Sequence, residues 1–167
     1  LLNMIKKINI FFLSMFFIGY SKYAPGTVAS FITSLMFIFL YNFQVNILYL
    51  ISSICLIFIY STYAIDRLKK KFTDIDAKEI VIDEFIGQAI PILTIYSILN
   101  FREIGYFIFY TLISFILFRF FDILKPYPIY IVDKNMKNGF GVVLDDVIAG
   151  IYSSIILLII VSFTYYA

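Results

Sequence analysis

Long apolar stretches, separated by short polar segments, make up most of this chain of 167 residues. The stretches cover residues 8–20, 28–41, 47–65, 80–99, 105–121 and 147–163. A helix that crosses a membrane needs about 20 apolar residues, with a range of about 17–25. The last four stretches have that length, whereas the first two are shorter. The pattern predicts an all-α, single-domain helical membrane protein over residues 1–167, with about four spanning helices after a short N-terminal helical hairpin.

The basic residues indicate how these stretches cross the membrane, because Lys and Arg gather on the cytoplasmic side. If the segment 66–79 is cytoplasmic, alternate crossing makes 122–146 cytoplasmic too. All 13 Lys and Arg residues except Arg102 then lie on that side. In this arrangement one of the first two apolar stretches crosses the membrane and the other folds back. We therefore expect the acidic residues at these helix ends to share one membrane face: Asp83, Glu84, Asp122, Asp133, Asp145 and Asp146.

Composition narrows the possible functions. Hydrophobic residues make up 62% of the chain and charged residues only 14%, against about 25% charged in a soluble domain. The net charge of +2 is too small to favour nucleic acid as a partner. The chain has no histidine, which excludes Ser-His-Asp triads, phosphohistidine chemistry and His-ligated zinc. Cys55 is the single cysteine, and its apolar surroundings predict a small buried side chain rather than a nucleophile.

Residues 118–150 are rich in charge for so apolar a protein. Charged side chains near hydrocarbon are costly, so a cluster of them is a candidate for a functional site. Carboxylates suit a hard cation such as Mg²⁺, and Lys and Arg suit phosphate. The segment contains both kinds: Arg119, Asp122, Lys125, Asp133, Lys134, Lys137, Asp145 and Asp146.

Two spacings within this segment are informative. Arg119, Asp122 and Lys125 are three residues apart, which places them on neighbouring turns of one helix face. They form either an internal ion-pair ladder or a phosphate clamp with a carboxylate that orients it or binds metal. The adjacent Asp145 and Asp146 repel each other when buried, unless a cation compensates. One as the cap of the final helix and the other as a metal ligand is a natural division.

Two earlier segments add further candidates. Near the N-terminus, the sequence Ala-Pro-Gly-Thr forms either an ordinary turn or a helix start, at which Thr27 caps and the Gly26 backbone approaches an anion. Farther along, Asp83 and Glu84 interrupt an apolar stretch, and charges in that setting favour a paired or metal-bound role over a helix cap. Asp83 shares a helix face with Gly87, whose missing side chain lets another helix approach.

Three sequence blocks follow one another along the chain. They are YAPGTVAS at 23–30, IVIDEFIGQ at 80–88, and FRFFDILKPYPI at 118–129 continuing through GFGVVLDDVIAG at 139–150. In these blocks the chain resembles the phosphatidylglycerophosphatase A family of bacterial membrane lipid phosphatases. The third block is long and chemically unusual, which makes the resemblance specific. Two mild departures are Ala29, where the family usually has Gly, and Asn138, where a Gly is common.

The resemblance implies an all-helical fold and Mg²⁺-dependent removal of the terminal phosphate from phosphatidylglycerophosphate, which gives phosphatidylglycerol. It also implies a location in the bacterial inner (cytoplasmic) membrane, with the active site facing the cytoplasm. With the charge pattern, it leads us to expect metal ligands at Asp83, Glu84, Asp122, Asp145 and Asp146. Catalytic residues are expected among Asp83, Glu84, Asp122 and Asp146. The substrate phosphate is expected to bind Arg119 and Lys125, with help from Gly26 and Thr27. The nucleophile is either water or a carboxylate, Asp83 or Asp122.

Two other functions are compatible with this composition. A phospholipid head-group transferase also presents several Asp residues in a helical membrane protein. Its pattern is a compact Asp-Gly-rich run along consecutive helix turns, which this sequence lacks. A small transporter or membrane scaffold would carry charges in the middle of its helices, lining a path. Here the charges gather at helix ends, which favours a surface-facing pocket. The expected partners are therefore a phospholipid substrate and the membrane.

Overall fold

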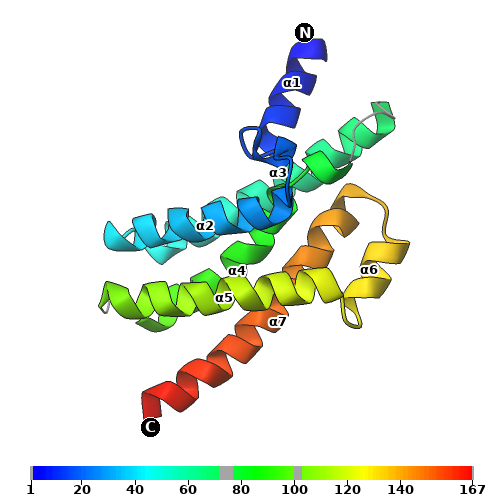
Figure 1. Cartoon of the computed structure of the whole chain (residues 1–167). Coiled ribbons are helices and arrows are strands. Elements are labelled where there is room, and N and C mark those ends of the chain that lie inside the picture. The colour runs from blue at the N-terminus through cyan, green and yellow to red at the C-terminus, as the bar shows by residue number, and fades with distance from the viewer. Residues whose placement is uncertain (1, 72–76, 100–102, 167) are drawn as a thin grey trace.

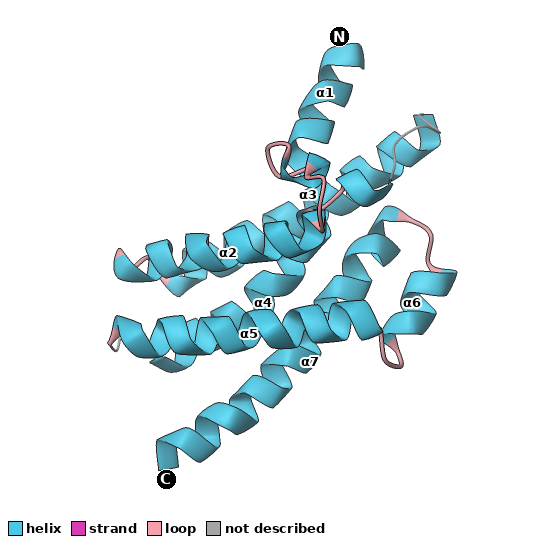
Figure 2. Ribbon diagram, in the orientation of Figure 1, coloured by secondary structure: helices cyan, strands magenta, loops and turns pink. Residues whose placement is uncertain are grey.

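The computed structural model in Figure 1 describes residues 2–71, 77–99 and 103–166. Within these ranges the chain is helical and contains no strand (Figure 2). The elements are, in chain order, α1 (Leu2–Leu13), the 3-10 helix η1 (Ile18–Tyr20), α2 (Pro25–Asn42), α3 (Ile47–Lys71), the 3-10 helix η2 (Ala77–Glu79), α4 (Ile82–Leu99), α5 (Ile104–Leu124), α6 (Ile129–Asn135) and α7 (Gly139–Tyr166). The predicted all-α fold class is confirmed.

Five of the described helices are long and apolar enough to cross a membrane: α2, α3, α4, α5 and α7. The predicted helical membrane protein is confirmed. Four of these helices match the four long apolar stretches, and α2 supplies the one crossing expected from the first two stretches. It begins at Pro25 rather than at residue 28, where the apolar stretch starts. Proline is favoured at the first position of a helix, so α2 takes in the polar start and reaches 18 residues. By contrast, α1 has only 12 residues, a length of about 18 Å against ~30 Å of hydrocarbon.

The helix α4 lies at the centre of the bundle and packs against α2, α3, α5 and α7. Of its apolar span 61% is buried within the protein, whereas only 22% of the α3 span is buried. Most of α3 therefore faces outward, where lipid tails would cover it. This corrects the expectation of a buried Cys55, because the Cys55 side chain lies on α3 and is exposed. Figure 1 shows α1 projecting away from the spanning helices.

Two glycines bring α4 and α7 into close contact. A β-carbon on Gly87 would lie 2.7 Å from the Asp146 carbonyl oxygen of α7 and 2.6 Å from the Phe118 ring of α5. A β-carbon on Gly150 would overlap the Gly87 carbonyl oxygen. Small residues let helix backbones approach inside a membrane, where van der Waals packing drives association. The approach of another helix at Gly87 was predicted, and that helix is α7.

The first turn of α7 begins at Gly139, so the prediction that Asp145 or Asp146 caps this helix is wrong. Two other side chains satisfy the N–H groups of this turn. Asp66 of α3 accepts a hydrogen bond from the Gly139 N–H at 2.6 Å. Asn138 Oδ1 accepts one from the Gly141 N–H at 2.8 Å. Because the helix starts this early, both aspartates lie well inside it, where their side chains can face the neighbouring helices.

Neutral hydrogen bonds join the helices within the apolar part of the bundle. Gln88 Nε2 donates to Ser114 Oγ at 3.2 Å, which links α4 to α5. Thr94 Oγ1 donates to Ser154 Oγ at 3.2 Å, which links α4 to α7. Such bonds average only about 0.6 kcal/mol in membrane helices. They therefore contribute more to the register of α4 against its neighbours than to overall stability.

Gly87→Ala is expected to push α4 and α7 apart, because the added methyl group meets the backbone of α7 and the Phe118 ring. Overpacking of this kind costs about 1–3 kcal/mol, so thermal unfolding of the detergent-solubilised protein should show a lower midpoint. Gly105→Ala is the matched control, since nothing lies within 4 Å of a β-carbon at that position. Equal midpoints for the two variants would contradict the close contact of α4 with α7.

Candidate functional site

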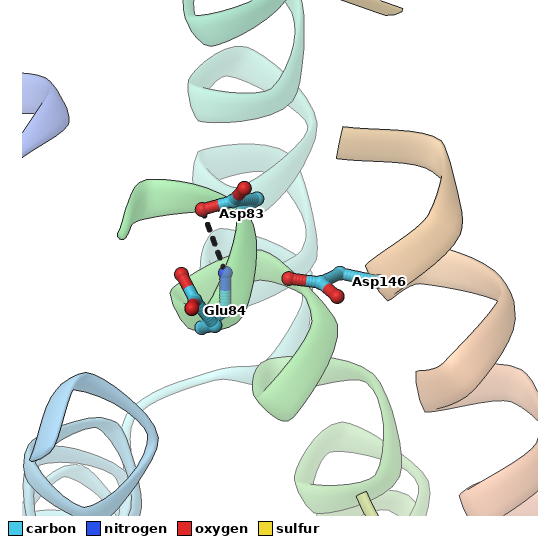
Figure 3. Close-up of side chains that lie close together, drawn as sticks. All are labelled: Asp83, Glu84 and Asp146. Atoms are coloured by element: carbon cyan, nitrogen blue, oxygen red, sulfur yellow. Dashed lines mark hydrogen bonds between the residues drawn. The ribbon is translucent and has the colours of Figure 1, made fainter. Parts of the chain in front are cut away.

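Three carboxylates meet where α4 begins, and we name them the acid trio: Asp83, Glu84 and Asp146. The first two lie in the first turn of α4, and Asp146 lies about two turns into α7. One oxygen from each carboxylate comes within 4.8 Å of the other two. Figure 3 shows the Asp146 side chain pointing from α7 toward the two side chains of α4. The contact at Gly87, one turn farther along α4, holds these two helix segments at this distance.

The members of the acid trio repel one another unless a cation lies between them. Two unit charges separated by 4.8 Å interact with about 3.5 kcal/mol at an effective dielectric constant of ~20. Among the residues that the structure describes, no Lys or Arg forms an ion pair with any of the three. Glu84 Oε2 is also buried without a hydrogen-bond partner. A buried carboxylate oxygen in this state is costly, so the trio is suited to hold a cation.

The donor atoms of the acid trio indicate which cation fits. Mg²⁺ takes oxygen ligands and is usually bound by one or two carboxylates plus substrate phosphates. Zn²⁺ is held mainly by His and Cys, and the chain has no histidine. Asp83 Oδ1 accepts a hydrogen bond from the Glu84 N–H at 3.2 Å, the dashed line in Figure 3, which orients the Asp83 carboxylate. A magnesium ion therefore fits the residues present.

The start of α2 lies against the acid trio. A β-carbon on Gly26 would overlap the Glu84 carboxylate, so the glycine leaves the space that this side chain occupies. The prediction that Thr27 caps the helix is wrong, because α2 begins at Pro25 and Thr27 lies within its first turn. The first turn of a helix presents backbone N–H groups that favour an anion. The predicted anion site at this helix start is thus beside the acids.

At the end of α5, Arg119 and Asp122 form an ion pair, with Nη1 2.6 Å from Oδ2. Of the two interpretations of their spacing, the ion pair is present in the structure. The buried Nε and Nη1 of Arg119 have no hydrogen-bond partner of good geometry, so the guanidinium keeps donors for a further acceptor. The charges of both residues act on Glu84, which shows that this pair lies close to the acid trio.

Lys125 follows the last residue of α5, which ends before Pro126 as predicted. Its Nζ lies 2.7 Å from Asp145 Oδ2 and 3.0 Å from Asp133 Oδ1. Burial alone would lower the pKa of the Lys125 ammonium group, but hydrogen bonds and charges of these two acids outweigh it and raise the pKa. Lys125 therefore stays charged at physiological pH and joins the end of α5 to α6 and α7.

The structure divides the five predicted metal ligands into two kinds. Three of them form the acid trio and have no ion-pair partner among the described residues. The other two, Asp122 and Asp145, pair with Arg119 and Lys125 at the edge of the trio. Their charges still act on Asp146. The two predicted phosphate-binding cations are therefore each already paired with an acid, and the charge of Arg119 also acts on Glu84.

Three residues that build the site were not identified from the sequence. Asp66 and Asn138 start α7 at Gly139, and this start determines which face of α7 carries Asp146. Gly150 completes the contact of α7 with α4. The Asn-Gly pair was a usable signal for a helix start, and Gly150 was a usable signal for a helix crossing. No local pattern indicated Asp66, because it lies 73 positions along the chain from Gly139, whose N–H donates the hydrogen bond.

Comparison with known proteins gives a consistent result. The family model for phosphatidylglycerophosphatase A matches residues 11–161. A phosphatidylglycerophosphatase A of Haemophilus influenzae is 37% identical over 134 residues, which is 80% of this chain and 76% of that protein. One from Escherichia coli is 31% identical over 142 residues, covering 83% of this chain and 75% of its own. A Bacteroides thetaiotaomicron protein, provisionally named a phosphatidylinositol-3-phosphatase, is 33% identical over 83% of this chain and 84% of its own. No solved structure shows a significant match.

Gly26→Ala is expected to displace the Glu84 carboxylate, because the added methyl group needs the same space. Disturbing the groups that position a metal ligand typically weakens metal affinity by about 10–100-fold. Isothermal titration of the purified protein with Mg²⁺ should therefore show binding at least about tenfold weaker than in the unchanged protein. Gly105→Ala, in open space on α5, should bind the ion normally. An unchanged affinity in Gly26→Ala would argue against the placement of α2 beside Glu84.

Proposed function

The chain belongs to the phosphatidylglycerophosphatase A family of phosphoric monoester hydrolases, and from that premise we propose its substrate and cofactor. The proposed substrate is phosphatidylglycerophosphate, whose terminal phosphomonoester is cleaved by water to give phosphatidylglycerol and inorganic phosphate. The proposed cofactor is Mg²⁺. The names of two relatives support the substrate. The observation that carries the cofactor is the acid trio with its unpartnered Glu84 oxygen.

Asp83, Glu84 and Asp146 are the residues proposed to hold the ion. When bound, Mg²⁺ would supply Lewis-acid polarisation of a phosphoryl oxygen and help to activate water. Figure 3 shows the Asp146 side chain reaching from α7 toward the first turn of α4, which carries the other two carboxylates. The phosphate group can complete the shell of oxygen ligands, which is the usual arrangement for Mg²⁺ in phosphoryl-transfer sites.

The cations at the end of α5 are proposed to bind the substrate phosphate. Arg119 has a buried, unpartnered Nε, which can donate to a phosphate oxygen while Nη1 stays near Asp122. Hydrogen bonds between guanidinium and phosphate are charge-assisted and about twice as strong as neutral ones. Lys125 adds a second positive charge, held in place by Asp145. The N–H groups at the start of α2 would face the same phosphate.

A carboxylate beside the phosphate is proposed to take the proton of the attacking water or to attack phosphorus itself. Asp83 and Asp122 are the two candidates for this role. Asp83 belongs to the acid trio, and a carboxylate that binds the ion is a weaker base. Asp122 is held by Arg119, so it lies where the phosphate would bind. In the first route the water oxygen bonds to phosphorus, the bond from phosphorus to the lipid alcohol oxygen breaks, and that oxygen takes up a proton as inorganic phosphate is released. In the second route the carboxylate forms an acyl phosphate as the protonated lipid alcohol leaves, and water then hydrolyses the acyl phosphate to inorganic phosphate and the free carboxylate.

We propose that the site faces the cytoplasm. The acid trio lies at the beginning of α4, on the same side of the spanning helices as the end of α5 and the helix α6. The sequence segments at this side carry nearly all of the Lys and Arg residues. Basic residues favour the cytoplasmic side of a bacterial membrane, and this supports the proposed orientation.

The metal and the acid trio are tested together by phosphate release from phosphatidylglycerophosphate in detergent micelles. With Mg²⁺ present we expect activity, and with EDTA we expect at least a hundredfold loss, of the order found when a group that stabilises transition-state charge is removed (about 10²–10³). Asp83→Asn, Asp122→Asn and Asp146→Asn should lose activity to a similar extent. Glu103→Gln is the control, because Glu103 lies at the opposite end of α5 from Asp122. Full activity in EDTA, or in all three variants, would rule out this mechanism.

Arg119→Lys tests the phosphate-binding role. Lysine keeps the positive charge but has no Nε–H and no planar fork of donors. We expect KM to rise by about tenfold, the equivalent of ~1.4 kcal/mol, with a smaller change in kcat. The same kinetics with phosphatidylinositol 3-phosphate would show whether the head group named for the Bacteroides relative is also accepted. An unchanged KM in Arg119→Lys would show that Nε does not contact the phosphate.

A further inference from the structure

A groove with a volume of about 450 Å³ lies between α3, α4 and α7. The described residues that line it are aliphatic or aromatic, apart from Cys55. Its floor is buried, since Ile54 and Ile86 are 9% and 1% exposed. Its rim is open, since Ile51, Cys55 and Ile59 of α3 are exposed. The groove therefore opens sideways from the protein, at the level of the spanning helices, where lipid hydrocarbon surrounds it.

One end of this groove lies next to the acid trio. Ile86 lines it on α4, three residues after Asp83, and Val147 lines it on α7, directly after Asp146. Residues three apart in a helix share a face and are about 4.5 Å apart along the axis. The groove therefore begins about one helical turn away from the carboxylates that are proposed to hold the ion.

The direction of the groove suits the tail of a lipid. Along α4 it runs from Ile86 to Leu93, away from the acid trio and toward the middle of the bilayer. Those seven helical steps span about 10 Å. A phospholipid whose phosphate lies at the trio must extend its acyl chains in this direction. Lining, position and direction thus all match a hydrocarbon chain.

The buried floor and the open rim of the groove suit a chain that enters from the surrounding lipid. A single alkyl chain is much thinner than a helix and can lie on the floor formed by Ile54 and Ile86.

We propose that this groove holds one acyl chain of the phospholipid substrate while the phosphate lies at the acid trio. This inference rests on the proposed function, because it needs a substrate that carries both a phosphate and a hydrocarbon tail. A chain held along α4 limits the directions from which the phosphate can approach Asp83 and Asp146. The groove would then act as a positioning subsite, which contributes to kcat/KM only for substrates whose chains are long enough to enter it.

Cys55→Phe tests the groove, because the larger side chain would narrow its open rim. Leu56→Phe is the matched control, since Leu56 is the next residue of α3, is 68% exposed and lies outside the groove. Values of kcat/KM would be measured in detergent micelles for long-chain and for dihexanoyl phosphatidylglycerophosphate. We expect Cys55→Phe to lower kcat/KM about tenfold for the long-chain lipid, the equivalent of ~1.4 kcal/mol of lost binding, and to leave the dihexanoyl lipid unaffected. Leu56→Phe should leave both values unchanged.

The outcomes separate this proposal from the proposed function. Equal effects of Cys55→Phe on the two lipids, no effect on either, or the same loss in Leu56→Phe would overturn the groove proposal. Failure of the unchanged enzyme to hydrolyse even the dihexanoyl lipid would overturn the proposed function instead.

If Cys55→Phe does not fold, alkylation of the folded enzyme with N-benzylmaleimide replaces it, because Cys55 is the single cysteine and is exposed. The alkylated enzyme should lose activity on the long-chain lipid alone, and alkylation without that loss would equally overturn the groove. Cys55→Ala, treated in the same way, should lose nothing relative to its untreated form.

Discussion

The contact of α4 with α7 at Gly87 and Gly150 is the constraint on which the rest of the site depends. Lipid tails are as apolar as the helices, so no hydrophobic force presses these helices together, and they associate through van der Waals packing. A gap of only 0.5–1 Å already forfeits about a quarter to a half of that attraction. The same seam carries Asp146 next to the first turn of α4 and forms one wall of the apolar groove. The proposed metal site and the proposed acyl-chain groove thus depend on one backbone contact.

The pairing of charges at this end of the bundle gives the acids different roles. Asp122 and Asp145 are neutralised by a cation each, so they can stay near hydrocarbon and hold that cation in place. The acid trio has no such partner among the described residues, so the uncompensated negative charge lies at this one place. The two basic side chains also differ. Lys125 faces two acids at once, whereas Arg119 keeps a free Nε, which makes Arg119 the more available partner for a phosphate.

The sequence predicts the membrane fold, and which residues belong to the candidate site, better than it predicts how those residues are arranged within the site. Apolar length and the rule for proline were enough to place α3, α4 and the end of α5. They misplaced the start of α2, because an apolar stretch does not include the polar first turn at Pro25. They also failed for α7, whose start depends on Asp66 of a distant helix. The division of five acids into a trio and two ion pairs depends on the directions in which side chains of three helices point. The spacing of residues along any one helix does not give these directions.

The helix ends around the site explain how three carboxylates can be held so close together. The first turns of α2 and α4 both meet the acid trio, and each helix start carries about half a positive charge. Together they offset about one of the three negative charges, which leaves roughly two. A divalent cation balances that remainder, whereas a phosphate dianion would be repelled by it. The end of α5 carries the opposite partial charge and presents Arg119 and Lys125 there, the usual position for cations. If Mg²⁺ is the cofactor, as proposed, this balance favours binding of the ion before the phosphate or together with it.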